Sequence, residues 1–267
     1  MRQSTIILFF LLFIDQHLRA QRVYTAANVH AHNDYQQSLP FFNAYTHQVG
    51  SIEADLFLQD NELYVAHEAK EISPERTLDV LYLQPLQAQI KKNKGSAYPH
   101  STAILQILID LKTNGTTTLP VLMRKLANYP EIRNNPTIQL VISGERPNPE
   151  TWSKYPSYIY FDATPGVNYT AEQLKKIRLF SASFRSYSQW NGEGSLEAAA
   201  EAKIRQAIDS AHQLNKKWRF WATPDNANTW QTLMQFKVDF IGTDDVTGLT
   251  SYLNKLPTNK NNSPRKN

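Results

Sequence analysis

Short apolar runs and amphipathic runs alternate along almost the whole chain, and this alternation constrains the fold more than any other feature. Each apolar run has the length of a strand, and the segment after it has helical spacing. In residues 196–214, for example, Ile204, Ile208 and Ala211 share one face. Strict alternation predicts a parallel sheet with helical crossovers. Eight such units in a chain of 267 residues predict the α/β class, with a single domain folded as a (β/α)8 TIM barrel.

The expected elements begin at residue 28. The expected strands are 28–32, 51–58 with an extension at 62–67, 104–112, 137–143, 157–162, 179–184, 218–222 and 240–242. The expected helices are 39–47, 77–92, 119–132, a short one from Pro149, one opened by a capping box at 170–173, and then 196–214, 230–236 and 249–256. An open doubly wound sheet is the structural alternative. It usually begins with a glycine-rich first turn, whereas the first turn here reads His32-Asn33-Asp34-Tyr35, which favours the barrel.

The start of the chain has the pattern of a secretory signal peptide over residues 1–20. Arg2 gives a basic start, Ile6 to Ile14 is apolar, and Ala20 marks the expected cleavage site. The apolar run is shorter than the roughly 20 residues that span a bilayer, so no stable membrane anchor is expected, although a retained anchor is the alternative. These features predict a secreted or periplasmic protein.

The net charge of +4 comes from the two ends of the chain. The signal segment contributes +1 and the tail at residues 258–267 contributes +3, so the predicted barrel domain at residues 21–257 is about neutral. Without a basic stripe on that domain, no nucleic-acid partner is expected. The tail is expected to be a disordered basic segment. The absence of cysteine excludes disulfides and thiolate metal sites, and no pattern indicates an oligomeric state.

Charged side chains close several of the expected strands. Glu53 and Asp55 lie two positions apart on the second strand and therefore share a face, as do Asp110 and Lys112 on the next. His32 ends the first strand. Catalytic groups of such barrels lie at the carboxyl ends of the strands, so these side chains are expected to meet.

The residue types indicate metal-assisted acid–base chemistry. Three carboxylates suit one hard divalent cation, Mg²⁺ or Ca²⁺. His32, together with His67 at the end of the extension, suits proton transfer near neutral pH. Taken singly, each residue could be a packed histidine or a solvent-facing acid; their recurrence at successive strand ends favours a site.

Four segments carry a resemblance to a known family. The stretches 31–34, 51–55, 65–68 and 109–112 resemble the glycerophosphodiester phosphodiesterase and phosphatidylinositol-specific phospholipase C-like superfamily, and 218–223 with 238–244 are similar to its last two strands. The string His-Asn-Asp-Tyr, with Ser-Gly-Glu-Arg-Pro at 143–147, looks closest to the branch that includes the fungal altered-inheritance-of-mitochondria proteins.

This resemblance implies a metal-dependent phosphodiesterase with specific residue roles. His32 and His67 would be the acid–base pair, Glu53, Asp55 and Asp110 would hold the cation, and Lys112 would contact the phosphate. The implied substrate is a small-molecule or lipid phosphodiester: a glycerophosphodiester, a phosphoinositide or a related phospholipid head group. Asn33 and Trp221 are expected to contact substrate, Trp221 as an aromatic wall, with core packing as the alternative for this tryptophan.

The chain departs from the family pattern at two positions. Asn33 stands where glycerophosphodiesterases usually have arginine, so the phosphate contact of that arginine is either missing or supplied elsewhere, by Arg146 or Arg185. Asp110 replaces the usual glutamate ligand. Among later strand ends, Asp244, Asp162 and Glu145 are candidate supporting residues.

Two other functions compete with this interpretation. The pair His30-x-His32 would suit an amidohydrolase-like metal hydrolase, but such enzymes need histidines at later strand ends. After His67 the chain has only His100, expected in a loop, and His212, expected on a helix. A non-catalytic ligand-binding barrel is the second alternative. His30 itself could be a hydrogen-bonded barrel filler or part of the metal or substrate shell.

Overall fold

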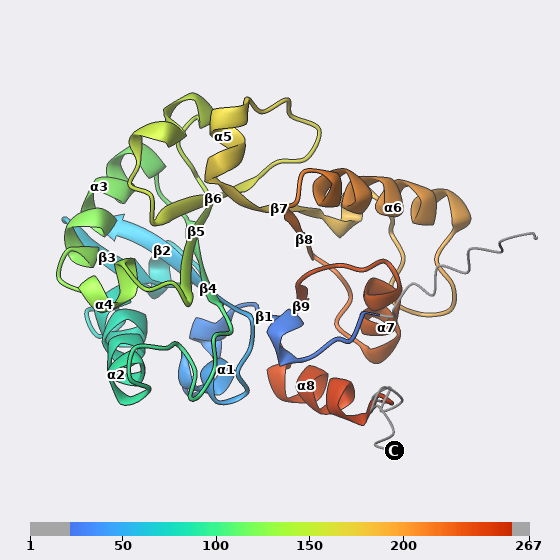
Figure 1. The fold of residues 1–267 in the computed structure, drawn as a ribbon, viewed down its shortest axis with the longest axis horizontal. Helices are drawn as coiled ribbons and strands as arrows, with labels where there is room; N and C mark the ends of the chain where they lie inside the picture. The colour runs from blue at the N-terminus through green and yellow to red at the C-terminus, as the bar shows by residue number, and fades with distance from the viewer. Residues whose placement is uncertain (1–21, 258–267) are drawn as a thin grey trace, which may run out of the picture.

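Eight parallel strands form a nearly closed barrel in the computed structural model, which describes residues 22–257 (Figure 1). The predicted (β/α)8 architecture is therefore confirmed. The strands pair in the order β8-β7-β6-β5-β4-β2-β1-β9. Their bounds are β1 (Val29–Ala31), β2 (Ser51–Gln59), β4 (Leu105–Leu111), β5 (Ile138–Gly144), β6 (Ile159–Ala163), β7 (Ile177–Ser183), β8 (Lys217–Trp221) and β9 (Ile241–Thr243).

The barrel closes between its last two strands. β9 pairs with β1 in parallel, so the end of the chain lies beside its beginning. On the other side, a single parallel bridge joins Arg219 on β8 to Phe240, the residue before β9. This closure brings residues from the two ends of the sequence to one mouth of the barrel.

Helices surround the strands on the outside of the ring (Figure 1). They are α1 (Phe42–Thr46), α2 (Gln84–Lys92), α3 (Gly115–Leu126), α4 (Pro130–Arg133), α5 (Ala171–Lys176), α6 (Ala198–Gln213), α7 (Ala227–Gln235) and α8 (Val246–Lys255). A π-helical turn at Asp79–Leu83 precedes α2, and Pro149–Lys154 forms a 3-10 helix. The predicted capping box before α5 is confirmed, since Thr170 and Gln173 bond each other's backbone amides.

The predicted helix 119–132 is two helices instead. The first begins four residues earlier, at Gly115, because the Asn114 side chain accepts a hydrogen bond from the Thr116 amide and caps it. It ends at Leu126, and Pro130 then begins α4 at a position where the missing amide proton costs nothing. The run of threonines at 116–118 concealed this early start.

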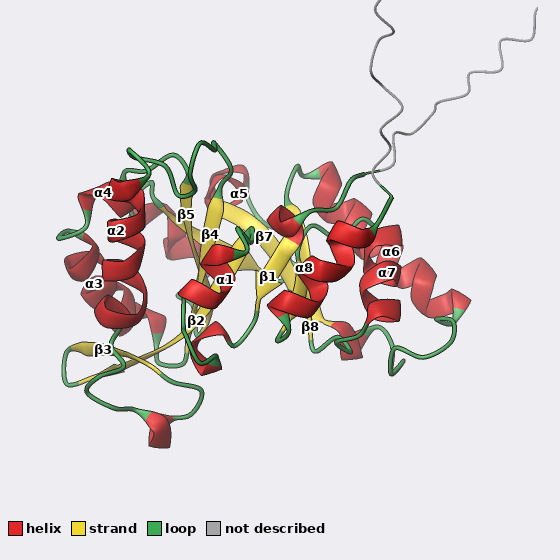
Figure 2. Cartoon of the chain, turned by 90° about the horizontal axis from the view of Figure 1, so that it is seen from below, coloured by secondary structure: helices red, strands yellow, loops and turns green. Residues whose placement is uncertain are grey.

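The expected extension of the second strand is a separate antiparallel strand, β3 (Glu62–Val65), which leaves the barrel as a hairpin (Figure 2). The turn uses Asp60 and Asn61, both with positive φ. The strand ends at Val65, two residues before the predicted limit. Its register still returns the chain to the barrel mouth, because the Ala66 amide donates to the Asp55 carbonyl.

The middle of the barrel is filled by a small apolar layer. Leu108, Val141, Leu179 and Phe240 form it, with Tyr160 packed against them. This layer separates the two ends of the barrel. None of the helices between residues 22 and 257 has the length and apolar character needed to cross a bilayer. The predicted signal peptide at 1–20 and tail at 258–267 lie outside the described residues.

Candidate active site

Three carboxylates meet at the carboxyl ends of β2 and β4. Glu53 and Asp55 are both buried, and the parallel register places Asp55 beside Asp110. One oxygen from each of the three lies within 4.8 Å of the other two. Burial, and then the nearby charge of Glu53, raises the pKa of Asp55 to about 6. The structure thus brings together the three residues predicted to hold a cation.

Lys112 supplies a positive charge between two of these carboxylates. Its Nζ lies 2.6 Å from Asp110 Oδ2 and 2.8 Å from Asp55 Oδ2. Burial alone would lower the pKa of Lys112, but its hydrogen bonds to Asp110 and Asp55 raise the pKa above its usual value. The ammonium group therefore offsets the repulsion between the acids. The other oxygen of Asp110 accepts a hydrogen bond from the Ser143 hydroxyl at 2.7 Å.

His30 is fully buried and orients Glu53 through a hydrogen bond. Its Nε2 lies 2.6 Å from Glu53 Oε2 and its Nδ1 lies 2.8 Å from the Ser51 hydroxyl, which also accepts from Gln106. Burial, followed by the charge of Arg219, lowers the pKa of His30 to about 4. A neutral ring fits this network when Ser51 donates to Nδ1 and Nε2–H donates to Glu53. His30 is thus a hydrogen-bonded filler that also supports a candidate ligand.

Arg219 is buried beside this pair, with one terminal nitrogen 3.4 Å from Glu53 Oε2. Burial alone would raise the pKa of Glu53, but the charge of Arg219 and the hydrogen bond from His30 hold it well below its usual value. Glu53 is therefore ionised. Since both nitrogens of His30 are used by protein groups, this geometry does not support the amidohydrolase-like pairing of His30 with His32 on a metal.

His32 forms a hydrogen bond with a carboxylate from the far end of the chain. Its Nδ1 lies 2.8 Å from Asp244 Oδ1, and Asn33 Nδ2 also donates to that oxygen at 3.3 Å. Burial would lower the pKa of His32, but the hydrogen bond to Asp244 and the charges of Glu53 and Asp244 raise it above its usual value. Asp244 thus holds the ring in one orientation and favours its protonated form.

His67 is linked to the carboxylates through Tyr35. The Tyr35 hydroxyl lies 2.7 Å from Asp55 Oδ2, 2.8 Å from Asn33 Oδ1 and 3.0 Å from His67 Nδ1. The hydroxyl has one proton, and the ionised Asp55 is its strongest acceptor. His67 Nδ1–H then donates to the Tyr35 oxygen, which leaves the lone pair on His67 Nε2 for chemistry.

A cavity of about 850 Å³ opens over part of this group and contains further positive charge, but Asp55 and His67 are not among the residues that line it. His32, Glu53, Asp110 and Lys112 line one side. Arg146 and Arg219 also line it, and Trp221, with 48% of its surface exposed, forms part of the wall. Trp221 is therefore not part of the core, and its predicted contact with substrate stays a prediction.

The remaining candidates differ in whether they line this cavity. Arg185 donates to the backbone carbonyls of Gln189 and Trp190 and is not among the residues that line it, so Arg146 is the better placed of the two predicted arginines. Asn33 donates to Asp244, lies beside the Tyr35 hydroxyl and also does not line the cavity. Asp162 does line it, and burial raises its pKa to about 6. Glu145 is exposed.

Two site residues were missed from the sequence. Tyr35 directly follows the His-Asn-Asp string, so its place in that string was the available signal. Arg219 alternates with Trp221 on β8, so the face assigned to Trp221 also contained the arginine. The sequence did not reveal that Arg219 lies beside Glu53, because the two residues are 166 positions apart.

The donor set fits a hard divalent cation. It consists only of carboxylate oxygens, and two of the three groups are buried together, where their charges repel each other. Among the described residues, this trio is the one group of acids and histidines spaced closely enough to hold a metal ion.

Comparisons with known proteins find relatives of this sequence. An AIM6-like phosphodiesterase domain matches residues 19–135. The altered inheritance of mitochondria protein 6 homolog of Arthroderma benhamiae is 28% identical over 261 residues, which cover 84% of this chain and 83% of that protein. Altered inheritance of mitochondria protein 6 of Kluyveromyces lactis is 27% identical over 307 residues, covering 87% and 73%.

The fold is also similar to a solved structure. A glycerophosphodiester phosphodiesterase from Parabacteroides distasonis superimposes with a TM-score of 0.50 and 13% sequence identity, covering 85% of this chain and 95% of that one. Together these matches confirm the resemblance to the glycerophosphodiester phosphodiesterase and phosphatidylinositol-specific phospholipase C-like superfamily.

The same relatives correct the prediction of a secreted or periplasmic protein. They are named for altered inheritance of mitochondria, which connects them with a process of the cell and not with export. The prediction rested on the composition of residues 1–20 alone, and a short apolar run beside basic residues is a weak signal for a destination.

Proposed function

We propose that this chain is a metal-dependent phosphodiesterase that cleaves a small-molecule or lipid-head-group phosphodiester by histidine acid–base catalysis. One observation carries the proposal. The carboxylate trio and two histidines, each held by a hydrogen-bond chain ending in a carboxylate, meet at the carboxyl ends of the barrel strands. Active sites of this fold lie at that end.

Glu53, Asp55 and Asp110 would hold one Mg²⁺ or Ca²⁺. The chemistry supplied by a divalent cation at that position is polarisation of a phosphate oxygen and stabilisation of the charge that develops on it. Lys112 lies between two of the acids and would contact a phosphate oxygen from that position. Arg219 and Arg146 add positive charge to the cavity, which offsets the arginine that Asn33 replaces.

The two histidines have different surroundings, which suggests different tasks. His67, with its Nδ1 proton held by Tyr35, presents a free lone pair and acts as general base toward the attacking hydroxyl or water. His32, whose protonated form is favoured by Asp244, acts as general acid toward the leaving alcohol. The attacking group is either a neighbouring hydroxyl of the substrate, which gives a cyclic phosphate, or water.

The test is turnover of bis(p-nitrophenyl) phosphate by the protein after EDTA treatment, with Mg²⁺, Ca²⁺ or Mn²⁺ added back. We expect activity that depends on the added metal and is lost in His32→Ala, His67→Ala and Asp110→Ala. Two controls place alanine at exposed positions: His100→Ala matches the histidine variants, and Glu172→Ala removes an exposed carboxylate on α5. Both should retain activity.

Each outcome discriminates between the candidate functions. Activity insensitive to EDTA, or unchanged in His32→Ala and Asp110→Ala, would overturn the proposal. Metal binding detected by calorimetry, with no turnover of this substrate or of glycerophosphodiesters and lysophospholipids, would favour the non-catalytic ligand-binding barrel. Cyclic and open products separate by ³¹P NMR, which decides between transfer and hydrolysis.

A further inference from the structure

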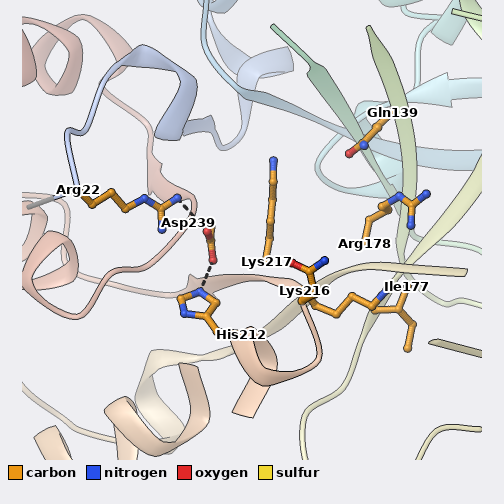
Figure 3. Close-up of a pocket in the computed structure, with 9 residues that line it drawn as sticks. Arg22, Gln139, Ile177, Arg178, His212, Lys216, Lys217 and Asp239 are labelled. Carbon is orange, nitrogen blue, oxygen red and sulfur yellow. Dashed lines mark hydrogen bonds and ion pairs between the residues drawn. The ribbon is translucent and has the colours of Figure 1, made fainter. Parts of the chain in front are cut away.

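A second cavity, of about 440 Å³, opens at the opposite end of the barrel (Figure 3). We call it the basal pocket. It lies where β5, β7 and β8 begin and is separated from the candidate active site by the apolar layer in the middle of the barrel. The residues that line it include four cationic side chains and a single carboxylate: Arg22, Arg178, Lys216, Lys217 and Asp239.

Both oxygens of the one carboxylate, Asp239, already have partners within the protein. Asp239 Oδ1 pairs with Arg22 at 2.9 Å, and its Oδ2 lies 2.8 Å from His212 Nε2 and accepts from the Trp218 amide at 2.8 Å. Among residues 22–257, these are the only ion pairs formed at the pocket. Arg178, Lys216 and Lys217 therefore form no ion pair with a carboxylate of the described chain.

These three cations are held in place by other contacts. Lys217 Nζ lies 4.3 Å from the centre of the Phe240 ring, and the Arg178 guanidinium lies 3.7 Å from that of Tyr160. Lys216 Nζ donates to the Leu174 carbonyl at 2.7 Å. All three are only partly exposed, so the group is preorganised and does not consist of mobile surface lysines.

The cations also oppose one another. Burial, and then the charge of Arg178, lowers the pKa of Lys216. Burial lowers the pKa of Lys217, the charge of Asp239 opposes this change, and Arg22 adds to the lowering. An arrangement of this kind costs folding free energy, and residues at this face of a barrel usually serve stability. A bound anion would relieve that cost.

We infer that the basal pocket is a second ligand site, which binds an anion carrying a phosphate monoester or diphosphate group. Three cations that line one partly enclosed cavity match the charge of such a group, and Arg178 offers the forked donors that phosphate oxygens accept. The volume suits a small phosphorylated molecule. The site is independent of the catalytic residues, because β8 presents Lys217 at one end and Trp221 at the other.

The test is calorimetric titration of the full-length protein with pyrophosphate in EDTA. The double variant Lys217→Met with Arg178→Gln keeps the packed stems and removes two charges, and should weaken the binding about tenfold or more. Lys175→Met, an exposed lysine on α5, is the matched control and should bind like the wild type. Turnover of bis(p-nitrophenyl) phosphate should be unchanged in all three proteins, which also verifies folding.

A second measurement needs no variant. Acylation of Lys216 and Lys217 in the wild-type protein, followed by mass spectrometry, should be slowed by pyrophosphate, while acylation of Lys175 should not. Equal affinities in the three proteins, or equal acylation with and without pyrophosphate, would overturn the inference. Glycerol 3-phosphate and vesicles of phosphatidylcholine with or without phosphatidic acid then distinguish a free metabolite from a lipid head group. Because the readouts are binding and protection, a failure of the proposed phosphodiesterase activity would leave this test intact.

Discussion

The Tyr35 hydroxyl lies 2.7 Å from Asp55 Oδ2 and connects a candidate metal ligand to a candidate catalytic histidine. Tyr35 itself is buried, so the hydrogen-bond chain from Asp55 to His67 is protected from water along most of its length. Orientation of catalytic and ligating groups by such supporting residues is a general requirement of metal sites.

Removal of this hydroxyl should impair catalysis more than folding. Tyr35→Phe should lower kcat by about 10- to 100-fold with a small change in KM, because His67 loses its orienting partner. Steady-state kinetics on bis(p-nitrophenyl) phosphate would measure both constants. The control is Tyr98→Phe, which removes a buried hydroxyl bonded to the Val49 carbonyl and should keep kcat. A kcat equal to that of the wild type in Tyr35→Phe would contradict the role of Tyr35.

Asp244 should set the protonation of His32. The hydrogen bond to Asp244 raises the pKa of His32 in the folded protein, so Asp244→Asn should lower that pKa. At pH 7 a smaller fraction of His32 would then be protonated, and if His32 is the general acid, the alkaline limb of the activity profile should move to lower pH. NMR titration of the His32 ring reports the pKa directly, and the resonance of exposed His100 serves as internal reference. An unshifted alkaline limb alongside a lowered His32 pKa would remove His32 from that role.

Asp34 should make the protein less stable as the pH rises. Burial raises the pKa of Asp34 to about 6 from 3.8, although its Oδ2 accepts from the Phe41 amide and the Tyr82 hydroxyl. A folded-state pKa above the unfolded value means that the folded protein binds more protons, so the stability falls between about pH 4 and 6.

The magnitude and its measurement follow from this linkage. A shift of two pKa units corresponds to roughly 3 kcal/mol in the free energy of unfolding. The wild type should lose this stability as the pH rises, and Asp34→Asn should not. Urea unfolding at a series of pH values from 4 to 7 would compare the slopes of the free energy of unfolding. Asp60→Asn, in the exposed turn before β3, is the control and should keep the wild-type slope. Parallel curves for the wild type and Asp34→Asn would refute this account.

Gly144, at the end of β5, should not tolerate a side chain. Its φ is +70°, and a Cβ there would lie 2.3 Å from the Leu111 carbonyl oxygen and 2.9 Å from Asp110 Oδ1. Gly144→Ala should therefore cost roughly 2–4 kcal/mol of stability and also displace a candidate metal ligand. Gly166 has a similar φ of +80° but, among the described residues, no atom within 4 Å of such a Cβ. Gly166→Ala should cost only about 1 kcal/mol, and a similar loss for both in chemical unfolding would rule out the clash.

The local part of the site was readable from the residues themselves. Side chains alternate along a strand, so the spacing of Glu53 and Asp55 was enough to place them on one face, and strand length with helical spacing was enough to predict eight units. The roles of His32 and His67 stay predictions, as do those of Lys112, Asn33 and Trp221. Element ends were less certain, because caps such as Asn114 act through side chains at one position.

Barrel closure decided what the sequence could not. The sequence by itself determined the order of strands and helices and the inward residues of each strand, because those depend on neighbours in the chain. Only the tertiary structure brought Asp244 into contact with His32, brought Arg219 into contact with Glu53, and gathered three cations around the basal pocket. These partners lie on β7, on β8 and in the loops before β8 and after β9, and only the ring of eight strands sets the distance and burial on which their charges depend.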